Sequence, residues 1–196
     1  MNKITERFNY LVFFISIQSM VGCTHIVTPA KIIDHYPQKK KINLHVNLKI
    51  PESLKTAKIE NNIAGDNWII QLGDNLINNS EQMAKALFVK AGKKQGPDIV
   101  LMPRLASAVA SHAAWIYDKS KVTLAMEWTV LDNKGATIWT ETVKGEGISA
   151  GGSGFAAKGN VEKRADMAIK KLFLNSYDAI YNSPIIRHWE RKNKKN

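Results

Sequence analysis

The clearest strand pattern in this chain runs from position 121 to position 130, where large apolar residues alternate with residues that are polar except at Ala125. Successive side chains of a strand point to opposite faces of a sheet, so this period of two predicts a strand with one buried face. Asp132-Asn133-Lys134-Gly135 follows, and such residues are typical of a tight turn in which glycine takes a positive φ angle. Residues 137–144 then return, so we expect an antiparallel hairpin.

Weaker periodicities extend this hairpin into a domain. Three earlier segments, 43–50, 68–72 and 99–113, have the apolar content of strands. One helix is predicted from an N-cap at Asn79 to about residue 91, and a second begins at an N-cap at Asn160. In both segments the apolar residues recur at helical spacing, which predicts one buried stripe on each helix.

The order of these elements is β, β, α, β, β, β, α. It favours an α+β fold with a mostly antiparallel sheet of about five strands and two helices packed on one face. The glycine-rich stretch 145–159, between the last strand and the last helix, is predicted to be a loop. We place the whole domain at residues 42–184.

The N-terminus has the features of an export signal. Positive residues precede an uncharged and mostly apolar stretch from 8 to 22, which is shorter than the roughly 20 residues of a membrane span. Met20-Val21-Gly22-Cys23 resembles the lipobox of bacterial lipoproteins. The resemblance implies that residues 1–22 are removed and that Cys23 is acylated, and the absence of aspartate at Thr24 implies an outer-membrane lipoprotein. Cys23 is the only cysteine, which excludes an internal disulfide and a thiolate zinc site.

The segments on either side of the domain are predicted to be loose. Residues 23–41 contain Pro29, Pro37 and a lysine run without any period, as in a flexible tether. Residues 185–196 form a basic tail. The net charge of +11 suits an anionic lipid or an acidic envelope protein, or serves solubility only. Nucleic acid is not expected as a partner because export removes the protein from the cytoplasm.

The order of elements over residues 43–183 resembles the auxiliary lipoproteins of ABC transporters and related small periplasmic lipoproteins. The residues that carry this resemblance are Trp128, Asp132, Gly135 and Trp139, on the hairpin and its turn. The resemblance implies an accessory or tethering role in an envelope transport or assembly system.

One motif raises the question of catalysis. Residues 147–151 match G-x-S-x-G with Ser149 at the centre, which in a serine hydrolase requires a buried strand before the serine and a helix directly after it. More glycine follows here, and His188 lies in the basic tail, so a flexible loop is favoured over a hydrolase. No two histidines stand three or four residues apart, so neither a metal site nor a cofactor is predicted.

Exposed aromatic residues are candidates for partner or lipid contact. Trp115 and Tyr117 follow an alanine-rich strand, and Trp189 lies between Arg187 and Arg191; the alternative for each tryptophan is core packing. The expected function is that of a non-enzymatic accessory or binding component, anchored to the outer membrane and facing the periplasm. The alternative is a lipid or glycolipid carrier with an apolar groove between sheet and helices.

Overall fold

The structure is a computed structural model that describes residues 23–29, 33, 35–63, 66–91, 96–111, 119–150 and 155–193. The predicted signal peptide 1–22 and the candidate contact residues Trp115 and Tyr117 lie outside these ranges. The strands are β1 (Thr24–Val27), β2 (Ile42–Leu48), β3 (Lys58–Ile63), β4 (Asp66–Gln71), β5 (Phe88–Ala91), β6 (Ile99–Ser111), β7 (Lys119–Asp132) and β8 (Thr137–Ala150), and the helices are α2 (Glu52–Lys55), α3 (Gly73–Leu87), α4 (Phe155–Asn182) and α5 (Pro184–Asn193).

The main sheet has five strands in the order β5-β2-β6-β7-β8. Strands β6, β7 and β8 are antiparallel neighbours, but β2 runs parallel to both β5 and β6. The α+β class and the number of strands in this sheet agree with the prediction, whereas the sheet is mixed rather than mostly antiparallel. The reason is topological: β3, β4 and α3 form a long crossover after β2, and a crossover returns the chain parallel to the strand it left.

A second sheet of three strands, in the order β1-β4-β3, was not predicted. Strand β1 lies where the sequence predicts a tether, and it pairs in parallel with β4 from Thr24 opposite Asn67 to Val27 opposite Ile70. Val27 is buried at 1% exposure, and the His25 ring stacks on Trp68 at 4.4 Å between centroids. Apolar burial and backbone pairing therefore hold the start of this segment in the fold.

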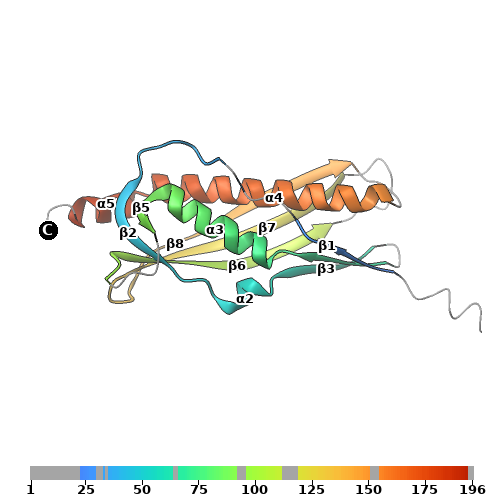
Figure 1. The fold of residues 1–196 in the computed structure, drawn as a ribbon, viewed down its shortest axis with the longest axis horizontal. Helices are drawn as coiled ribbons and strands as arrows, with labels where there is room; N and C mark the ends of the chain where they lie inside the picture. The colour runs from blue at the N-terminus through green and yellow to red at the C-terminus, as the bar shows by residue number, and fades with distance from the viewer. Residues whose placement is uncertain are drawn as a thin grey trace, which may run out of the picture.

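The helices are not all on one face of a sheet. Helix α4 lies along β7 and β8 for most of the length of the molecule, and α3 packs against α4, β2 and β5 (Figure 1). Helix α2 contacts α3 and β6, and α5 lies at one end of the molecule against β2 and β8 (Figure 1). The predicted apolar stripe of α4 is buried throughout: Val161, Ala165, Ala168, Ile169, Leu172, Phe173, Tyr177 and Ile180.

Four predicted boundaries are wrong. Helix α3 begins at Gly73, and Asn79 is a buried residue inside it, where its Oδ1 accepts a hydrogen bond of 2.8 Å from the Ile33 backbone N. The helix ends at Leu87 because residues 88–91 pair with β2 as strand β5. Residues 145–150 belong to β8 rather than to a loop, and α4 begins at Phe155, before Asn160.

The hairpin of β7 and β8 is confirmed. Gly135 has a φ of +86°, and Asp132 Oδ1 accepts hydrogen bonds of 2.9 and 2.8 Å from the backbone N of Lys134 and of Ala136. Trp128 is fully buried, and its Nε1 donates to Ser176 Oγ on α4 at 2.8 Å. The aromatic residues of this hairpin therefore belong to the core.

Candidate functional site

Cys23 is exposed and directly precedes β1. Its carbonyl oxygen accepts a hydrogen bond of 2.9 Å from the Asn67 backbone N, so the cysteine is joined to the small sheet by its own main chain. A shallow depression of about 380 Å³ adjoins it, lined by Thr24, Glu60, Asn61, Asn62, Asn67, Trp68 and Ile69. The predicted acylation site thus lies at the edge of the fold, beside a surface rich in amide groups.

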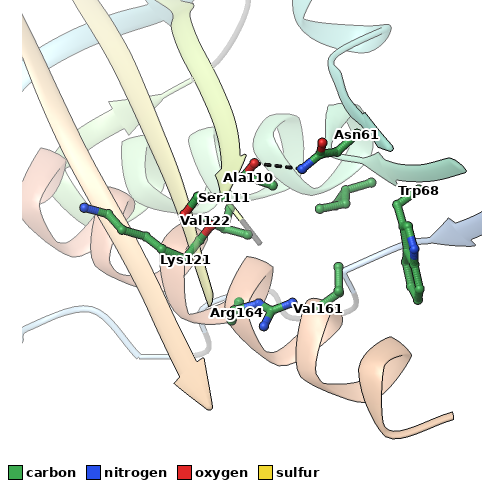
Figure 2. Close-up of a pocket in the computed structure, with 9 residues that line it drawn as sticks. Asn61, Trp68, Ala110, Ser111, Lys121, Val122, Val161 and Arg164 are labelled. Atoms are coloured by element: carbon green, nitrogen blue, oxygen red, sulfur yellow. Dashed lines mark hydrogen bonds between the residues drawn. The ribbon is translucent and has the colours of Figure 1, made fainter. Parts of the chain in front are cut away.

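A second feature, which we call the junction pocket, lies where the two sheets meet α4 (Figure 2). It has a void of about 10 Å³, which is close to the smallest space that holds one water molecule. Across it, Asn61 Nδ2 on β3 donates a hydrogen bond of 2.8 Å to the Ala110 carbonyl on β6. The lining residues come from five elements: Asn61, Trp68, Ile70, Ala110, Ser111, Lys121, Val122, Val161 and Arg164.

Arg164 is the unusual residue of the junction pocket. Its side chain is on the buried side of α4, with 3% exposure of the residue, and burial lowers the pKa of its guanidinium below the ordinary value. The Nη1 atom donates to Ser149 Oγ at 3.4 Å, and the Nε atom has no hydrogen-bond partner among the described residues. A buried charge without compensation is costly, so this guanidinium requires an explanation.

Arg164 was not predicted from the sequence as a site residue, although a signal was present. It stands three residues after Val161 and four before Ala168, which places it on the apolar stripe of the helix. A charged residue on a buried stripe is an exception to the usual pattern and marks a candidate site.

The G-x-S-x-G motif has a structural role. Gly145 and Gly147 are buried residues of β8, and a Cβ atom on Gly147 would lie 2.7 Å from the Arg164 carbonyl carbon and 2.9 Å from the Ala168 backbone N. The glycines let the backbone of α4 lie directly on β8. Ser149 is a strand residue, so the strand-to-helix turn of a nucleophile elbow is absent at this position. The G-x-S-x-G spacing therefore reflects close packing.

The close approach of α4 to β8 also limits where the predicted lipid groove could lie. A carrier of the predicted kind needs free space between the sheet and the helices. At Gly145 and Gly147 that space is filled, because the glycines bring strand and helix into backbone contact. At these two described positions there is therefore no room for a groove between β8 and α4.

The predicted basic tail is the helix α5, with Ile186 buried. Arg187 contacts Tyr181 in two ways. Its Nε donates a hydrogen bond of 3.0 Å to the Tyr181 backbone carbonyl, and its guanidinium lies 4.1 Å from the centroid of the Tyr181 ring. Trp189 is half-buried against the core, with Lys192 Nζ 5.2 Å from its ring centroid. Arg191 is exposed. Of the predicted contact residues in this helix, Arg187 and Trp189 are half-buried and only Arg191 is exposed.

No helix among the described residues has both the length and the apolar character needed to cross a membrane. No group of three or more histidine, cysteine, aspartate or glutamate side chains is placed to hold a metal ion in the ranges that the structure describes.

Comparison with known proteins finds similarity at the level of structure. No family model and no curated protein matches the sequence. The crystal structure of protein XCC0632 from Xanthomonas campestris, with the family description DUF330, is similar with a TM-score of 0.56 and 10% identity, over 88% of this chain and 100% of that chain. A minor lipoprotein from Acinetobacter baumannii has a TM-score of 0.46 and 11% identity, over 79% of this chain and 96% of that chain. At such identities the first similarity shows a shared fold alone, and the second is too weak to extend it.

Proposed function

We propose that this chain is a lipid-anchored, non-enzymatic accessory protein of the bacterial cell envelope. The observation that carries the proposal is the sequence of an apolar, uncharged segment that ends in Val21-Gly22-Cys23, together with the exposure of Cys23 at the edge of the folded domain. Two or three acyl chains hold a protein on a membrane stably, since each buried CH₂ contributes about 0.8 kcal/mol. In the finer form of the proposal, the membrane is the outer membrane and the domain faces the periplasm.

The structure adds an orientation to this proposal. Because β1 starts one residue after Cys23, an acylated cysteine would hold the small sheet close to the bilayer rather than on a flexible tether. Helix α5 lies at the opposite end of the long axis from β1 (Figure 1). Its basic residues would then point away from that membrane, toward an anionic partner in the envelope. Anchoring would raise the local concentration of the domain near such a partner.

The anchor is tested with Cys23→Ser in the native host, followed by mass spectrometry and membrane fractionation. We expect the wild-type protein to begin at Cys23, to gain the mass of its acyl chains and to remain in the membrane fraction after a high-salt wash. The variant should keep residues 1–22 or appear in a soluble fraction. Thr24→Ser is the matched control and should behave as the wild type.

The choice of membrane is tested with Thr24→Asp. If enteric-type sorting applies, this variant stays in the inner membrane, whereas the wild type and Thr24→Ser reach the outer membrane. Wild-type protein that carries an unmodified Cys23 thiol, or a Cys23→Ser variant that stays in the membrane as the wild type does, would refute the proposed anchor.

A further inference from the structure

The junction pocket contains an element that the proposed anchor does not use. It is the point where the small sheet, the main sheet and α4 come together, and Asn61 on β3 joins the two sheets across it by a hydrogen bond to β6 (Figure 2). Trp68, Val122 and Val161 make much of its wall apolar. Apolar walls exclude water and therefore strengthen any electrostatic interaction formed inside.

The charges around this pocket are unbalanced. The lining residue Lys121 forms an ion pair with Glu146 through its Nζ. None of the ion pairs formed among described residues involves Arg164. Its Nη1 donates a hydrogen bond of 3.4 Å to the neutral hydroxyl of Ser149. The Nε–H group of Arg164 is buried without an acceptor among those residues. An arginine in this state has the planar, charged donor set that binds oxyanions.

We propose that the junction pocket is an anion-binding site in which Arg164 recognises a carboxylate or phosphate group. The inference goes beyond the proposed anchor, because it concerns a different part of the molecule and holds whether or not Cys23 is acylated. The ligand oxygen would accept a hydrogen bond from Arg164 Nε and supply the countercharge that the described residues do not provide.

The size of the void limits what can enter. A space of about 10 Å³ accommodates an oxygen atom of the anion, and the rest of the ligand must lie outside, toward Asn61, Ser111 and Lys121. Asn61 and Ser111 are neutral and polar, and the charge of Lys121 is already paired with Glu146, so Arg164 is the one unpaired cation among the described lining residues. The same oxyanion chemistry occurs in a free small acid and at the charged end of a lipid, so the probes must separate these two sources.

The test uses full-length protein in an uncharged detergent, with thermal unfolding and isothermal titration calorimetry as measurements. The probes are sodium acetate, inorganic phosphate and sodium octanoate, each compared with sodium chloride at the same ionic strength. We expect at least one oxyanion to raise the unfolding midpoint of the wild type in a saturable way, because a ligand that binds only the folded state stabilises it. Acetate or phosphate binding indicates a free small anion, whereas binding of octanoate alone indicates an anion that carries an acyl chain.

Arg164→Met should weaken this binding at least tenfold and should raise the unfolding midpoint without anion, since it replaces a buried charge by an apolar side chain of similar length. Arg164→Lys keeps the charge but loses the planar fork and should bind more weakly than the wild type. Lys163→Met, at the exposed neighbouring position of α4, is the matched control and should bind as the wild type does.

Several outcomes would overturn the proposal. One is a wild-type protein whose unfolding midpoint responds to no oxyanion more than to chloride, a result that stands even if Arg164→Met fails to fold. Another is equal binding by the wild type and Arg164→Met or Arg164→Lys. A third concerns Asp66 and Asp118, whose side chains the structure does not describe. If Asp66→Asn or Asp118→Asn destabilises the wild type but does not destabilise Arg164→Met, that aspartate interacts with Arg164. The countercharge would then come from the protein itself and not from a bound anion.

Discussion

Gly147→Ala is the substitution that tests the packing of α4 on β8 most directly. In an open strand, alanine at this position would be neutral or stabilising, since glycine loses more conformational freedom on folding by roughly 0.5–1 kcal/mol. Here the new Cβ would lie 2.7 Å from the Arg164 carbonyl carbon and nearer still to its oxygen, whereas ordinary contact begins at 3.4 Å. The obstacle is backbone, which no rotamer change can remove.

The helix would have to move away from the strand, and its buried stripe would move with it. Ala165, Ala168 and Ile169 lie in this part of α4 with no exposure, so the shift would loosen contacts on both sides of the helix. Overpacking of a core costs about 1–3 kcal/mol and sometimes more, and a clash with rigid backbone belongs at the upper end of that range. We expect a loss of about 3 kcal/mol in the free energy of unfolding.

The assay is urea unfolding followed by far-UV circular dichroism, with the midpoint and slope fitted separately. Gly135→Ala is the control, because Gly135 has a φ of +86° and a Cβ atom added there would meet no other atom within 4 Å. That variant has backbone strain without a clash and should lose only about 1 kcal/mol. A Gly147→Ala protein as stable as the wild type, or more stable, would refute the close approach of strand and helix.

Three further predictions concern buried polar groups. Asn79→Ala should lower the free energy of unfolding by about 2 kcal/mol, because the Ile33 backbone N–H loses its acceptor, and hydrogen exchange at the Ile33 amide should quicken. Ser176→Ala should lower it by about 1–3 kcal/mol in a urea titration, because the buried Trp128 Nε1 loses its partner. Burial raises the pKa of the Tyr36 hydroxyl well above its ordinary value of 10.0, so the unfolded chain loses this proton at a lower pH than the folded protein. The free energy of unfolding should therefore fall as the pH rises above 10. Urea unfolding midpoints measured across that pH range should fall less steeply for Tyr36→Phe than for the wild type.

The sequence predicted the elements whose conformation is set by their own residues, namely β7, the turn that follows it and the buried stripe of α4. The Asp132-to-Gly135 turn required no knowledge of the rest of the chain, because the turn residues satisfy their own hydrogen bonds. The strand β7 and the buried stripe of α4 were predicted because the period of their apolar residues matches the geometry of a single element.

Elements that depend on distant partners were not predicted. The short strand β5 continues an apolar helical pattern, and only its pairing with β2 makes it a strand. Strand β1 has no period to detect, and β4 determines its conformation by backbone pairing. Asn79 resembled a helix cap because asparagine favours caps, but its amide is used inside the fold to satisfy the backbone of Ile33.

The glycines of β8 connect the fold to the candidate site. Glycine in a sequence is ambiguous, since it marks a flexible loop in one context and a close approach of two backbones in another. At Gly147 the approaching backbone is that of Arg164 itself, so the strand determines how deeply this residue of α4 is placed. A larger residue at 147 would hold the helix further out, where water could reach the guanidinium. The charge at position 164 is buried because Gly147, on the strand opposite, has no side chain. The stretch predicted to be a flexible loop is therefore, at Gly147, the part of β8 that brings Arg164 to the junction of the two sheets.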